Sequence, residues 1–520
     1  MKNSLVVHHD NIISKNLFVE SIHFNFLNGD IDKYIHSKII PQLVKNNFDI
    51  LYIKDSLSSN YLDFYGLRLA YHIRLSPELK EKSFVPIVMI SDLDVYLLNK
   101  LTPMANIFFT KNIFIASNTK KSIVHHNELK FSNLSEQEYE SDFLNKIQIE
   151  APKESHHDIS NEWSIYQWSE FLKIKDSEVI NENKEKISSM LYFKYLLAKT
   201  KIVEPKKGSI SFVPQPPQRD GKILYIDDEW NKGWGDIFKR HFSKNKNIEF
   251  DIFEHDFRDY NKFSIISSIK NKCKNCDPDL VILDLRLVEK DHEIDRKLEQ
   301  FTGIEITKAI KKINPAIQIL MFTATSQSLI LEKLYERAIL GYIKKEHPKD
   351  NIAVKDSFDK LKILVDKGLE KKYLKKIWDI QEQISIDNSK IQLEIKSIFE
   401  ILNSEMENRF IYAMFAIFKC IELVNDIYII DGYKKATWKD TNQSFSDNSS
   451  KNKITLILNE RLKLREDSIH ESITNIIKVR NNTIHPKQGR VEKIDKDNIL
   501  KWFEMLQEIL ERVENDQSNP

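Results

Sequence analysis

The stretch Lys222–Glu346 decides the fold, because it holds four short apolar runs that each end in polar residues. The runs are KILYI (222–226), LVIL (280–283), IQILMF (317–322) and GYI (341–343), followed in turn by Asp227-Asp228, Asp284, Thr323 and Lys344-Lys345. Short apolar runs bounded by turn-forming residues are typical of buried parallel strands. Ligands bind at the carboxyl edge of such a sheet. The sequence therefore predicts three carboxylates, a hydroxyl and an ammonium in one crevice.

The predicted crevice has the chemistry of phosphoryl acceptance by an aspartate. Clustered carboxylates repel one another unless a cation lies among them, and hard oxygen ligands of this kind suit Mg²⁺. An aspartate beside the metal ion can act as a nucleophile toward a phosphoryl group. The lysine would neutralise phosphoryl oxygens, and the threonine would donate a hydrogen bond to one of them.

This order of residues resembles the receiver domain of two-component response regulators. ILYIDDE (223–229) resembles the acidic pair of that family, DLVILDLRL (279–287) its phosphoacceptor strand, FTAT (322–325) its switch hydroxyl, and GYIKKE (341–346) its tyrosine and lysine. The resemblance implies that Asp227, Asp228 and Asp284 hold Mg²⁺ and that a partner histidine kinase phosphorylates Asp284. It also implies that Thr323 senses the phosphoryl group, that Tyr342 is an aromatic switch and that Lys345 pairs with the phosphate.

Two features depart from the family pattern. Glu346 stands where the family usually has a proline, often with a cis bond, and a cis bond at a non-proline residue costs about 2.5–4 kcal/mol. The family's glycine lies close behind the phosphoacceptor, whereas Gly303 comes 19 residues after Asp284. The charged insert, LVEKDHEIDRKLEQFT (287–302), is expected to be either a lid over the site or a solvated loop, and the loop is the simpler interpretation.

Residues 1–125 repeat the strand pattern with different chemistry. SLVV (4–7) precedes His8-His9-Asp10, FDILYI (48–53) precedes Lys54, and VPIVMI (85–90) precedes Ser91. Lys54 takes the phosphoacceptor position, one acid of the metal pair is missing, and Lys111 is expected at the position of Lys345. A lysine cannot form an acyl phosphate and repels Mg²⁺, and Asp55 is expected on the opposite face if the strand runs through it. We therefore expect a pseudo-receiver used for docking or dimerisation.

The composition indicates an ordered protein of several domains. A length of 520 residues allows three or four domains, and an apolar content of 41% supports real cores. The net charge of +1 gives no overall attraction to nucleic acid or anionic lipid. The three cysteines imply no disulfide framework, and the pair Cys273–Cys276 is expected in a connecting loop. No secretory signal or membrane-spanning run is recognised, so a cytoplasmic protein is expected.

The predicted fold class is α/β plus all-α, with two flavodoxin-like, doubly wound parallel sheets and a C-terminal helical bundle. The expected segments are a receiver-like domain (1–125), a helical spacer (126–212), a Pro-rich linker (213–220), the phosphoacceptor receiver domain (221–365) and an all-α domain (366–520). In the spacer, the aromatic residues of Asn161–Lys173 are expected to pack in a core, and His156-His157 to lie in a solvated cap or turn. Apolar periodicity predicts helices over 377–401, 410–430, 456–464, 468–479 and 499–513, with an exposed loop at 437–452.

A second candidate site lies in IIKVRNNTIHP (476–486). Pro486 biases His485 away from helical dihedrals, so the helix is expected to end here with the imidazole free to turn toward Arg480. Such a pair suits metal-free RNA cleavage, because a histidine can move the proton of a ribose 2′-hydroxyl while a guanidinium holds the phosphate. The pattern resembles the R-x(4–6)-H motif of the HEPN superfamily. The resemblance implies that Arg480 and His485 are catalytic, that Asn481 supports them, and that two protomers build the site as a homodimer.

Two functions follow from these segments. In the first, phosphorylation of Asp284 controls an HEPN-like ribonuclease, which by analogy suits stress response or phage defence. In the second, the helical domain is a non-enzymatic adaptor for dimerisation or partner binding, and phosphorylation gates its assembly. No helix-turn-helix or other DNA-reading pattern is recognised after the receiver, so an ordinary transcription factor is not expected.

Overall fold

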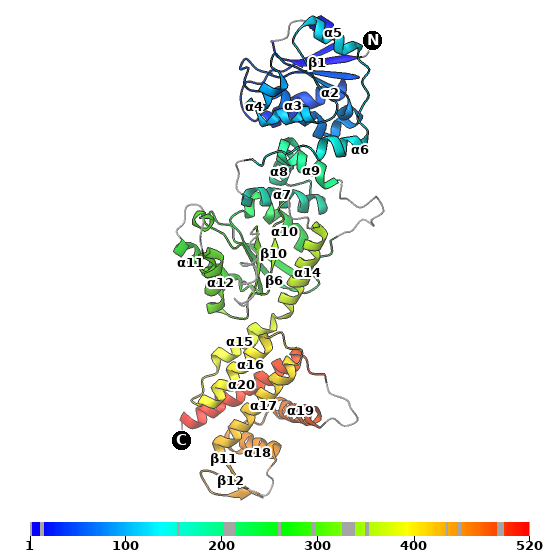
Figure 1. Cartoon of the computed structure of the whole chain (residues 1–520). Helices are drawn as coiled ribbons and strands as arrows, with labels where there is room; N and C mark the ends of the chain where they lie inside the picture. Colours follow the sequence, from blue (N-terminus) through cyan, green and yellow to red (C-terminus); the bar gives the residue numbers. More distant parts are fainter. Residues whose placement is uncertain are drawn as a thin grey trace. The chain divides into compact units, whose positions relative to one another are not determined.

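The structure is a computed structural model of the chain (Figure 1). It describes residues 3–10, 15–152, 156–201, 214–257, 262–293, 297–324, 339–348, 353–432, 435–445, 449–485 and 493–518. The chain forms two compact units. Unit 1 consists of residues 1–213 and 345–354, and unit 2 consists of residues 214–344 and 355–520.

Unit 1 is built on a sheet with the strand order β2-β1-β3-β4-β5, in which all neighbours are parallel. This is the doubly wound order of flavodoxin-like folds. Side chains alternate between the faces: Leu5, Val7 and Ile53 join one buried cluster, and Val6 and Tyr52 join another. Both faces are therefore buried, as is usual for parallel sheets. The strands are β1 (Ser4–His8), β2 (Glu20–His23), β3 (Ile50–Lys54), β4 (Ile87–Ile90) and β5 (Ile113–Ala116).

Helices cover the two faces of this sheet. The larger cluster draws residues from α3, α7 and α9, while Ile123 of α5 belongs to the smaller one. The longer helices are α3 (Tyr65–Leu75), α4 (Val95–Leu101), α5 (Lys120–Glu128), α7 (His156–Phe171), α8 (Glu178–Ser189) and α9 (Leu191–Lys201). Shorter pieces are η1 (Lys15–Leu17), α1 (Ile31–Tyr34), η2 (Ile35–Ile39), α2 (Ile40–Lys45), η3 (Pro77–Phe84), η4 (Pro103–Phe109), α6 (Glu136–Tyr139) and η5 (Glu140–Leu144).

Unit 2 holds a second parallel sheet with the equivalent order β7-β6-β8-β9-β10. One face packs on α10, where Phe238 meets Tyr225 and Phe322 at ring distances of 4.8 and 5.1 Å. Residues of α11 and α12 join the cluster on the other face. The strands are β6 (Gly221–Ile226), β7 (Ile248–Ile252), β8 (Leu280–Leu283), β9 (Gln318–Thr323) and β10 (Gly341–Lys344). The helices are η6 (Trp230–Lys232), α10 (Trp234–Phe242), α11 (Lys262–Cys276), η7 (Glu289–His292), η8 (Leu298–Gln300), α12 (Thr302–Ile313) and α14 (Val354–Glu370).

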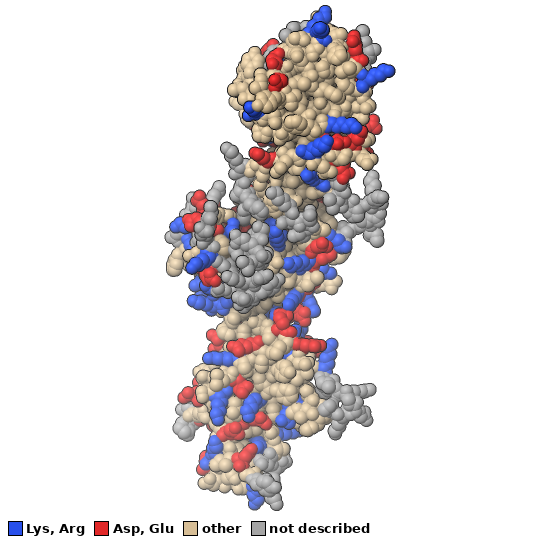
Figure 2. Space-filling view, viewed as in Figure 1, with Lys and Arg blue, Asp and Glu red and all other residues tan. Residues whose placement is uncertain are grey.

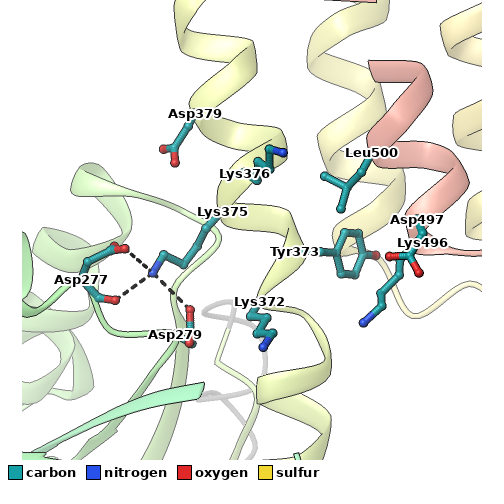
Figure 3. Close-up of a pocket in the computed structure, with 10 residues that line it drawn as sticks. All are labelled: Asp277, Asp279, Lys372, Tyr373, Lys375, Lys376, Asp379, Lys496, Asp497 and Leu500. Atoms are coloured by element: carbon teal, nitrogen blue, oxygen red, sulfur yellow. Dashed lines mark hydrogen bonds and ion pairs between the residues drawn. The ribbon is translucent and has the colours of Figure 1, made fainter. Parts of the chain in front are cut away.

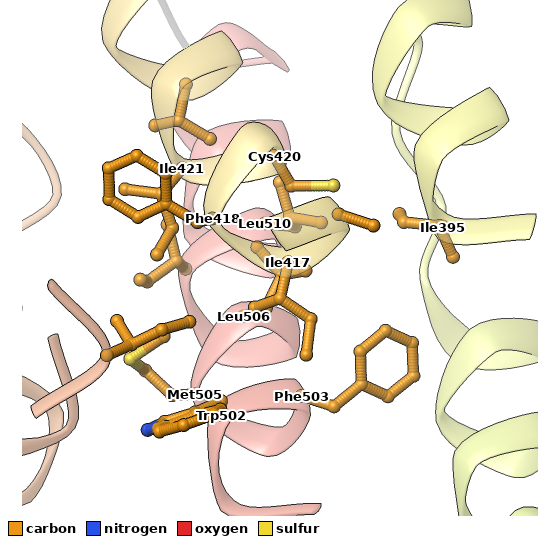
Figure 4. Close-up of a cluster of buried hydrophobic side chains, with 14 of the residues drawn as sticks. Ile395, Ile417, Phe418, Cys420, Ile421, Trp502, Phe503, Met505, Leu506 and Leu510 are labelled. Atoms are coloured by element: carbon orange, nitrogen blue, oxygen red, sulfur yellow. The ribbon is translucent and has the colours of Figure 1, made fainter. Parts of the chain in front are cut away.

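The rest of unit 2 is mainly helical and shares one apolar core. In Figure 4, Ile417 and Ile421 of α17 face Leu506 and Leu510 of α20, and Ile395 of α16 closes the group. The helices are α15 (Tyr373–Gln383), α16 (Ser389–Asn403), α17 (Arg409–Tyr428), α18 (Ser450–Leu456), η9 (Ile457–Arg461), α19 (Asp467–Ile484) and α20 (Lys496–Ser518). A small antiparallel sheet adds β11 (Ile429–Asp431), β12 (Ala436–Trp438) and β13 (Ser444–Phe445).

An ionic joint connects the sheet of unit 2 to this helical part (Figure 3). Lys375 of α15 reaches the loop before β8, where its ammonium lies 2.8 Å from Asp277 Oδ2 and 3.1 Å from Asp279 Oδ1. Asp279 also accepts a hydrogen bond from the N–H of Lys222 at 2.9 Å, at the start of β6. The joint therefore fixes the first helix of the helical part to the amino ends of two strands.

Several sequence expectations need correction. Residues 437–452 do not form only an exposed loop, because β12 and β13 lie there and α18 begins at Ser450. The helix expected over 377–401 is broken between α15 and α16, and α14 continues through the expected boundary at 365/366. Cys273 and Cys276 lie in the last turn of α11, not in a loop. No helix within the described ranges combines the length and apolar character needed to cross a membrane.

Candidate functional site

Three carboxylates meet at the carboxyl edge of the second sheet. Asp227 and Asp228 directly follow β6, and Asp284 directly follows β8. One oxygen from each lies within 4.8 Å of the others, and Asp227 and Asp284 are fully buried while Asp228 is half-buried. Among the described residues, this is the only group of His, Cys, Asp or Glu side chains spaced for a metal ion. Carboxylate oxygens gathered in this way fit a hard divalent cation such as Mg²⁺, which would offset their mutual repulsion.

Local hydrogen bonds orient these carboxylates. The N–H of Leu285 donates to Asp284 Oδ1 at 2.5 Å, and the N–H of Glu229 donates to Asp227 Oδ1 at 2.8 Å. The hydroxyl of Tyr225 donates to Asp227 Oδ2 at 2.7 Å. Burial first, and then the charge of Asp227, raises the pKa of Tyr225 well above its usual value. Tyr225 therefore remains a hydrogen-bond donor at neutral pH.

The charged insert contributes to the architecture beside the site. Asp291, in η7, is fully buried and accepts hydrogen bonds from the N–H groups of Leu287 at 3.0 Å and Thr302 at 3.2 Å. The insert thus has a carboxylate anchor at its base, whereas Glu289, Lys290, His292 and Glu293 beside it are exposed, as expected for a solvated loop; residues 294–296 lie outside the described residues. After it, Gly303 brings the start of α12 against the end of β8, and its N–H donates to Leu285 O at 3.1 Å.

The remaining predicted side chains lie on the next two strands. Thr323 ends β9 and is 1% exposed, and Lys345 follows β10 and is fully buried. Tyr342 lies within β10, half-buried, and the ammonium of Lys360 lies 4.1 Å from the centre of its ring. Thr323 therefore lies at the same edge as the carboxylates, while Tyr342 is covered by a residue of α14.

Glu346, at the position where the receiver family usually has a proline, is buried and hydrogen-bonded. No peptide bond in the described ranges is cis, the one that joins Lys345 to Glu346 included. The Glu346 side chain is 3% exposed, and both of its oxygens accept from the indole N–H of Trp168, at 2.9 and 3.1 Å. The Trp168–Glu346 contact joins a loop to α7, within unit 1.

The first sheet repeats the second, residue by residue. Lys54 follows Ile53, which pairs with Val7, just as Asp284 follows Leu283, which pairs with Ile226. The same register makes His8 and His9 equivalent to Asp227 and Asp228, Ser91 to Thr323, and Asn118 to Lys345. Both acids of the metal pair are therefore replaced, so the expectation of a single missing acid is wrong. Lys111 precedes β5 and pairs with Glu138, so its expected equivalence to Lys345 is also wrong.

In the first sheet, the ammonium of Lys54 lies at the edge that corresponds to the three carboxylates of the second sheet. Lys54 is 1% exposed, and its Nζ lies 2.6 Å from Asp55 Oδ1 and 3.2 Å from Asp92 Oδ2. Asp55 Oδ2 accepts from the hydroxyl of Ser91 at 2.6 Å. Asp55 therefore lies on the same side as Lys54; the opposite face was expected only for a strand that runs through Asp55, and β3 ends at Lys54.

The residues of the second candidate site lie at the carboxyl end of α19. His485 ends α19 with φ −125° and ψ 72°, so the expected departure from helical geometry occurs. Arg480 Nη1 donates to Asn481 Oδ1 at 3.0 Å, and the guanidinium lies 4.9 Å from the centre of the Phe418 ring. Among the described residues, no hydrogen bond or ion pair joins Arg480 to His485; Pro486 lies outside them. On the face shown in Figure 2, Lys and Arg are interspersed with Asp and Glu over the helical part of unit 2.

Comparisons with known proteins agree with the receiver-like folds. Residues 3–116 match the family model iREC, the inactive Receiver domain, so the expected degenerate receiver is confirmed over that range. A search of curated proteins found no match to the chain.

Three solved structures illustrate the similarity. NtrX from Brucella abortus in complex with ADP is 18% identical over 35% of this chain, with a TM-score of 0.22, and the alignment spans only 33% of NtrX. A LuxR-family response regulator from Aurantimonas sp. SI85-9A1 is 20% identical over 28% of this chain and 86% of its own, with a TM-score of 0.19. The receiver domain of the Francisella response regulator 1452 is 15% identical over 29% and 98%, with a TM-score of 0.21. Identities this low do not establish a shared activity.

Sequence reasoning missed three groups of residues. Tyr225 lies two residues before Asp227, and this spacing could have indicated a hydroxyl on the same side of β6. Asp291 and the Glu346–Trp168 contact carried no such signal. The role of Asp291 depends on how the backbone of the insert folds around it, and that of Glu346 on an indole 178 positions away.

Proposed function

We propose that this chain is a signalling protein of the response-regulator type, in which Asp284 accepts a phosphoryl group with the help of Mg²⁺. The observation that supports this most strongly is the cluster of Asp227, Asp228 and Asp284, in which one oxygen of each lies within 4.8 Å of the others and two of the three residues are buried. Structural acids seldom gather so closely at a strand edge, because each buried charge raises the cost of the next. A partner histidine kinase would supply the phosphoryl group.

The transfer itself needs little from the protein beyond positioning and charge. A carboxylate oxygen of Asp284 attacks the phosphorus of a phosphohistidine; the P–N bond breaks, and the imidazole leaves with the electron pair and takes up a proton. Bound Mg²⁺ would neutralise phosphoryl charge and screen the three carboxylates. Thr323 would donate a hydrogen bond to the new acyl phosphate, and Lys345 would neutralise its negative oxygens.

The first sheet would serve as a binding module. Lys54 stands at the phosphoacceptor position, and its ammonium occupies the region where a metal ion would otherwise be held. Transfer to a lysine would not give an acyl phosphate, and a divalent cation beside Lys54 would be repelled. We assign this domain to docking or dimerisation, independent of Mg²⁺.

For the output we propose an HEPN-like ribonuclease that is completed when two chains meet. His485 would act as the acid or base, Arg480 would hold the scissile phosphate, and Asn481, which already accepts a hydrogen bond from Arg480, would orient the guanidinium. A non-enzymatic adaptor is the second candidate. The observation in its favour is that Arg480 lies against Phe418 without a bond to His485 among the described residues.

The receiver proposal is tested by incubating the full chain with acetyl phosphate and Mg²⁺ and counting phosphorylated species by intact mass. We expect one phosphoryl group on the wild type and none on Asp284→Asn. Asp228→Asn should require much more Mg²⁺ for the same yield, and Asp55→Asn should behave as the wild type. Phosphorylation that survives in Asp284→Asn would refute the assignment.

The output is tested in the same tube with a generic single-stranded RNA. Cleavage by the phosphorylated or unphosphorylated wild type that is lost in His485→Ala supports the ribonuclease. Self-association that changes with phosphorylation, with intact RNA in every sample, supports the adaptor.

A further inference from the structure

Glu346 is an unusual residue to find in the loop that follows β10. It carries a carboxylate, it is 3% exposed, and it directly follows the buried Lys345. A buried carboxylate is costly unless hydrogen bonds replace its hydration. Trp168 of α7 supplies such bonds, since its indole N–H lies 2.9 and 3.1 Å from the two oxygens of Glu346.

The backbone of the same residue is held as well. The hydroxyl of Ser164 donates to the carbonyl oxygen of Glu346 at 2.9 Å. Ser164 and Trp168 are one helical turn apart on α7, so they present both donors from one side of the helix. Both side chains are completely buried. Glu346 is thus fixed at its side chain and at its main chain by a single helix.

This side of α7 differs from the side that packs in the core of unit 1. Ile159, Trp163 and Tyr166 join the large apolar cluster, and Trp163 stacks on Phe193 at 6.3 Å. Ser160, Ser164 and Trp168 follow each other at four-residue spacing and do not belong to that cluster. Small hydroxyl side chains there let a loop approach the helix closely. One side of α7 therefore packs in the apolar core of unit 1, and another side contacts the loop that contains Glu346.

We propose that Glu346 is a positioning residue for Lys345, and that its anchorage on Trp168 couples α7 to the phosphoryl group at Asp284. This inference rests on the proposed function. A proline would restrict the backbone by its ring, whereas here two hydrogen bonds to α7 restrict it. When Lys345 moves to meet the acyl phosphate, Glu346 moves with it, and its hydrogen bonds to Trp168 and Ser164 transmit the change to α7.

The experiment uses the full chain labelled with 5-fluorotryptophan and followed by ¹⁹F NMR. The chain has seven tryptophans, and Trp168→Phe identifies the resonance of Trp168. Trp234, whose ring meets Phe322 of β9 at 4.6 Å, reports on the receiver-like sheet. Trp502, in the helical core, reports that the chain is folded. Spectra are taken before and after acetyl phosphate and Mg²⁺, with phosphorylation measured by intact mass.

We expect the Trp168 resonance to shift on phosphorylation in the wild type and to stay fixed in Asp284→Asn. Glu346→Ala should slow phosphorylation by about tenfold to 100-fold, as misplaced catalytic groups commonly do. Glu346→Gln, which keeps a carbonyl oxygen for the indole, should restore most of the rate. Trp163→Phe is the matched control on the same helix and should leave the rate unchanged.

The outcomes separate the two proposals. No phosphorylation of the wild type would overturn the proposed function and this inference with it. Phosphorylation with a shifted Trp234 but an unmoved Trp168, and equal rates for Glu346→Ala and the wild type, would overturn this inference alone. If the Trp502 resonance shows that Glu346→Ala does not fold, Trp168→Phe provides the test instead. This variant removes the indole N–H that Glu346 accepts and should also slow phosphorylation.

Discussion

The buried lysine of the first crevice has a measurable effect on stability. Lys54 lies against Asp55, whose side chain is 6% exposed, and removing one member of a buried ion pair leaves an uncompensated charge. We expect Lys54→Met to destabilise the first sheet by about 3–5 kcal/mol. Hydrogen exchange of peptides from β3 and β4, followed by mass spectrometry, measures the local loss.

Two further variants make that result specific. Lys111→Met breaks an exposed pair with Glu138 and should leave stability almost unchanged, because solvent screens that pair. The double variant Lys54→Met/Asp55→Asn removes both charges and should recover part of the loss. Equal exchange rates in Lys54→Met and the wild type would show that the ammonium contributes nothing to the fold.

A buried histidine makes the second sheet sensitive to acid. His241 of α10 is 1% exposed, and its ring meets Phe358 at 5.1 Å. Burial, with a smaller effect of Lys244, lowers the pKa of His241 from 6.5 to about 3. Unfolding therefore takes up a proton between these two pH values. The stability is complete above pH 6.5 and falls as the pH drops, by at most about 1.4 kcal/mol per pH unit from this group.

The substitution His241→Phe should remove this contribution. We expect denaturant midpoints, read from tryptophan fluorescence, to fall less between pH 7 and pH 5 in the variant than in the wild type. His485→Phe, at an exposed position, serves as the control and should keep the wild-type slope. Parallel pH profiles for His241→Phe and the wild type would refute the assignment.

At the scale of elements, two glycines fix how a helix meets a strand end. A Cβ on Gly303 would lie 2.5 Å from Asp284 O, and one on Gly66 would lie 2.0 Å from Lys54 O. Both obstacles are backbone atoms, which cannot turn aside as a side chain would. We expect Gly303→Ala and Gly66→Ala each to cost about 1–3 kcal/mol in their own sheet.

In a phosphorylation assay, Gly66→Ala is the control for Gly303→Ala. Gly303→Ala should also slow phosphorylation, because the shift falls on the residue that carries the nucleophile. Gly66→Ala should leave phosphorylation at the wild-type rate, as intact mass would show. A stable Gly303→Ala protein with full phosphorylation would mean that the helix can move away freely.

The sequence predicted that residues following clear apolar runs converge at one edge of the sheet. It did not predict side-chain positions that depend on the exact residue at which a strand begins or ends. The runs 222–226 and 280–283 could be read as strands, and the three acids that follow them therefore converge. Lys111 was misplaced because the apolar residues before it form η4, and the strand begins only at Ile113. Asp55 was assigned to the opposite face on the condition that the strand runs through it, but β3 ends one residue before it, at Lys54. The alternation of side chains assigns a residue to one face of the sheet only while the strand continues.

Tertiary contacts formed by individual side chains could not be predicted from the sequence. Nothing in the loop GYIKKE indicates that Glu346 finds the indole of Trp168, 178 positions away. Nor does the charged insert show in its sequence that Asp291 is the acid that is buried and accepts the backbone N–H groups at its base. Such pairings follow from the packing of whole elements, which one sequence does not report.

At the scale of the molecule, the ionic joint of unit 2 decides whether its sheet and its helices unfold together. The side chains of Lys375 and Asp279 are 10% and 12% exposed, whereas that of Asp277 is 65% exposed, so the pair with Asp279 dominates. Asp279 would keep its hydrogen bond from Lys222 if Lys375 were lost, yet its second oxygen would face α15 without a cation. The joint thus links both parts energetically.

We expect Lys375→Met to separate one cooperative unfolding transition of unit 2 into two, as seen by scanning calorimetry of the full chain. The neighbouring Lys376→Met is the matched control, because Lys376 forms its exposed ion pair with Glu504, inside the helical part. The double variant Lys375→Met/Asp279→Leu removes the buried charge left behind and should bring the transitions closer again. If Lys375→Met unfolds as cooperatively as Lys376→Met, other contacts between the two parts, such as the Lys372–Asp220 ion pair, suffice, and a phosphoryl signal at Asp284 would have to reach the helices through them.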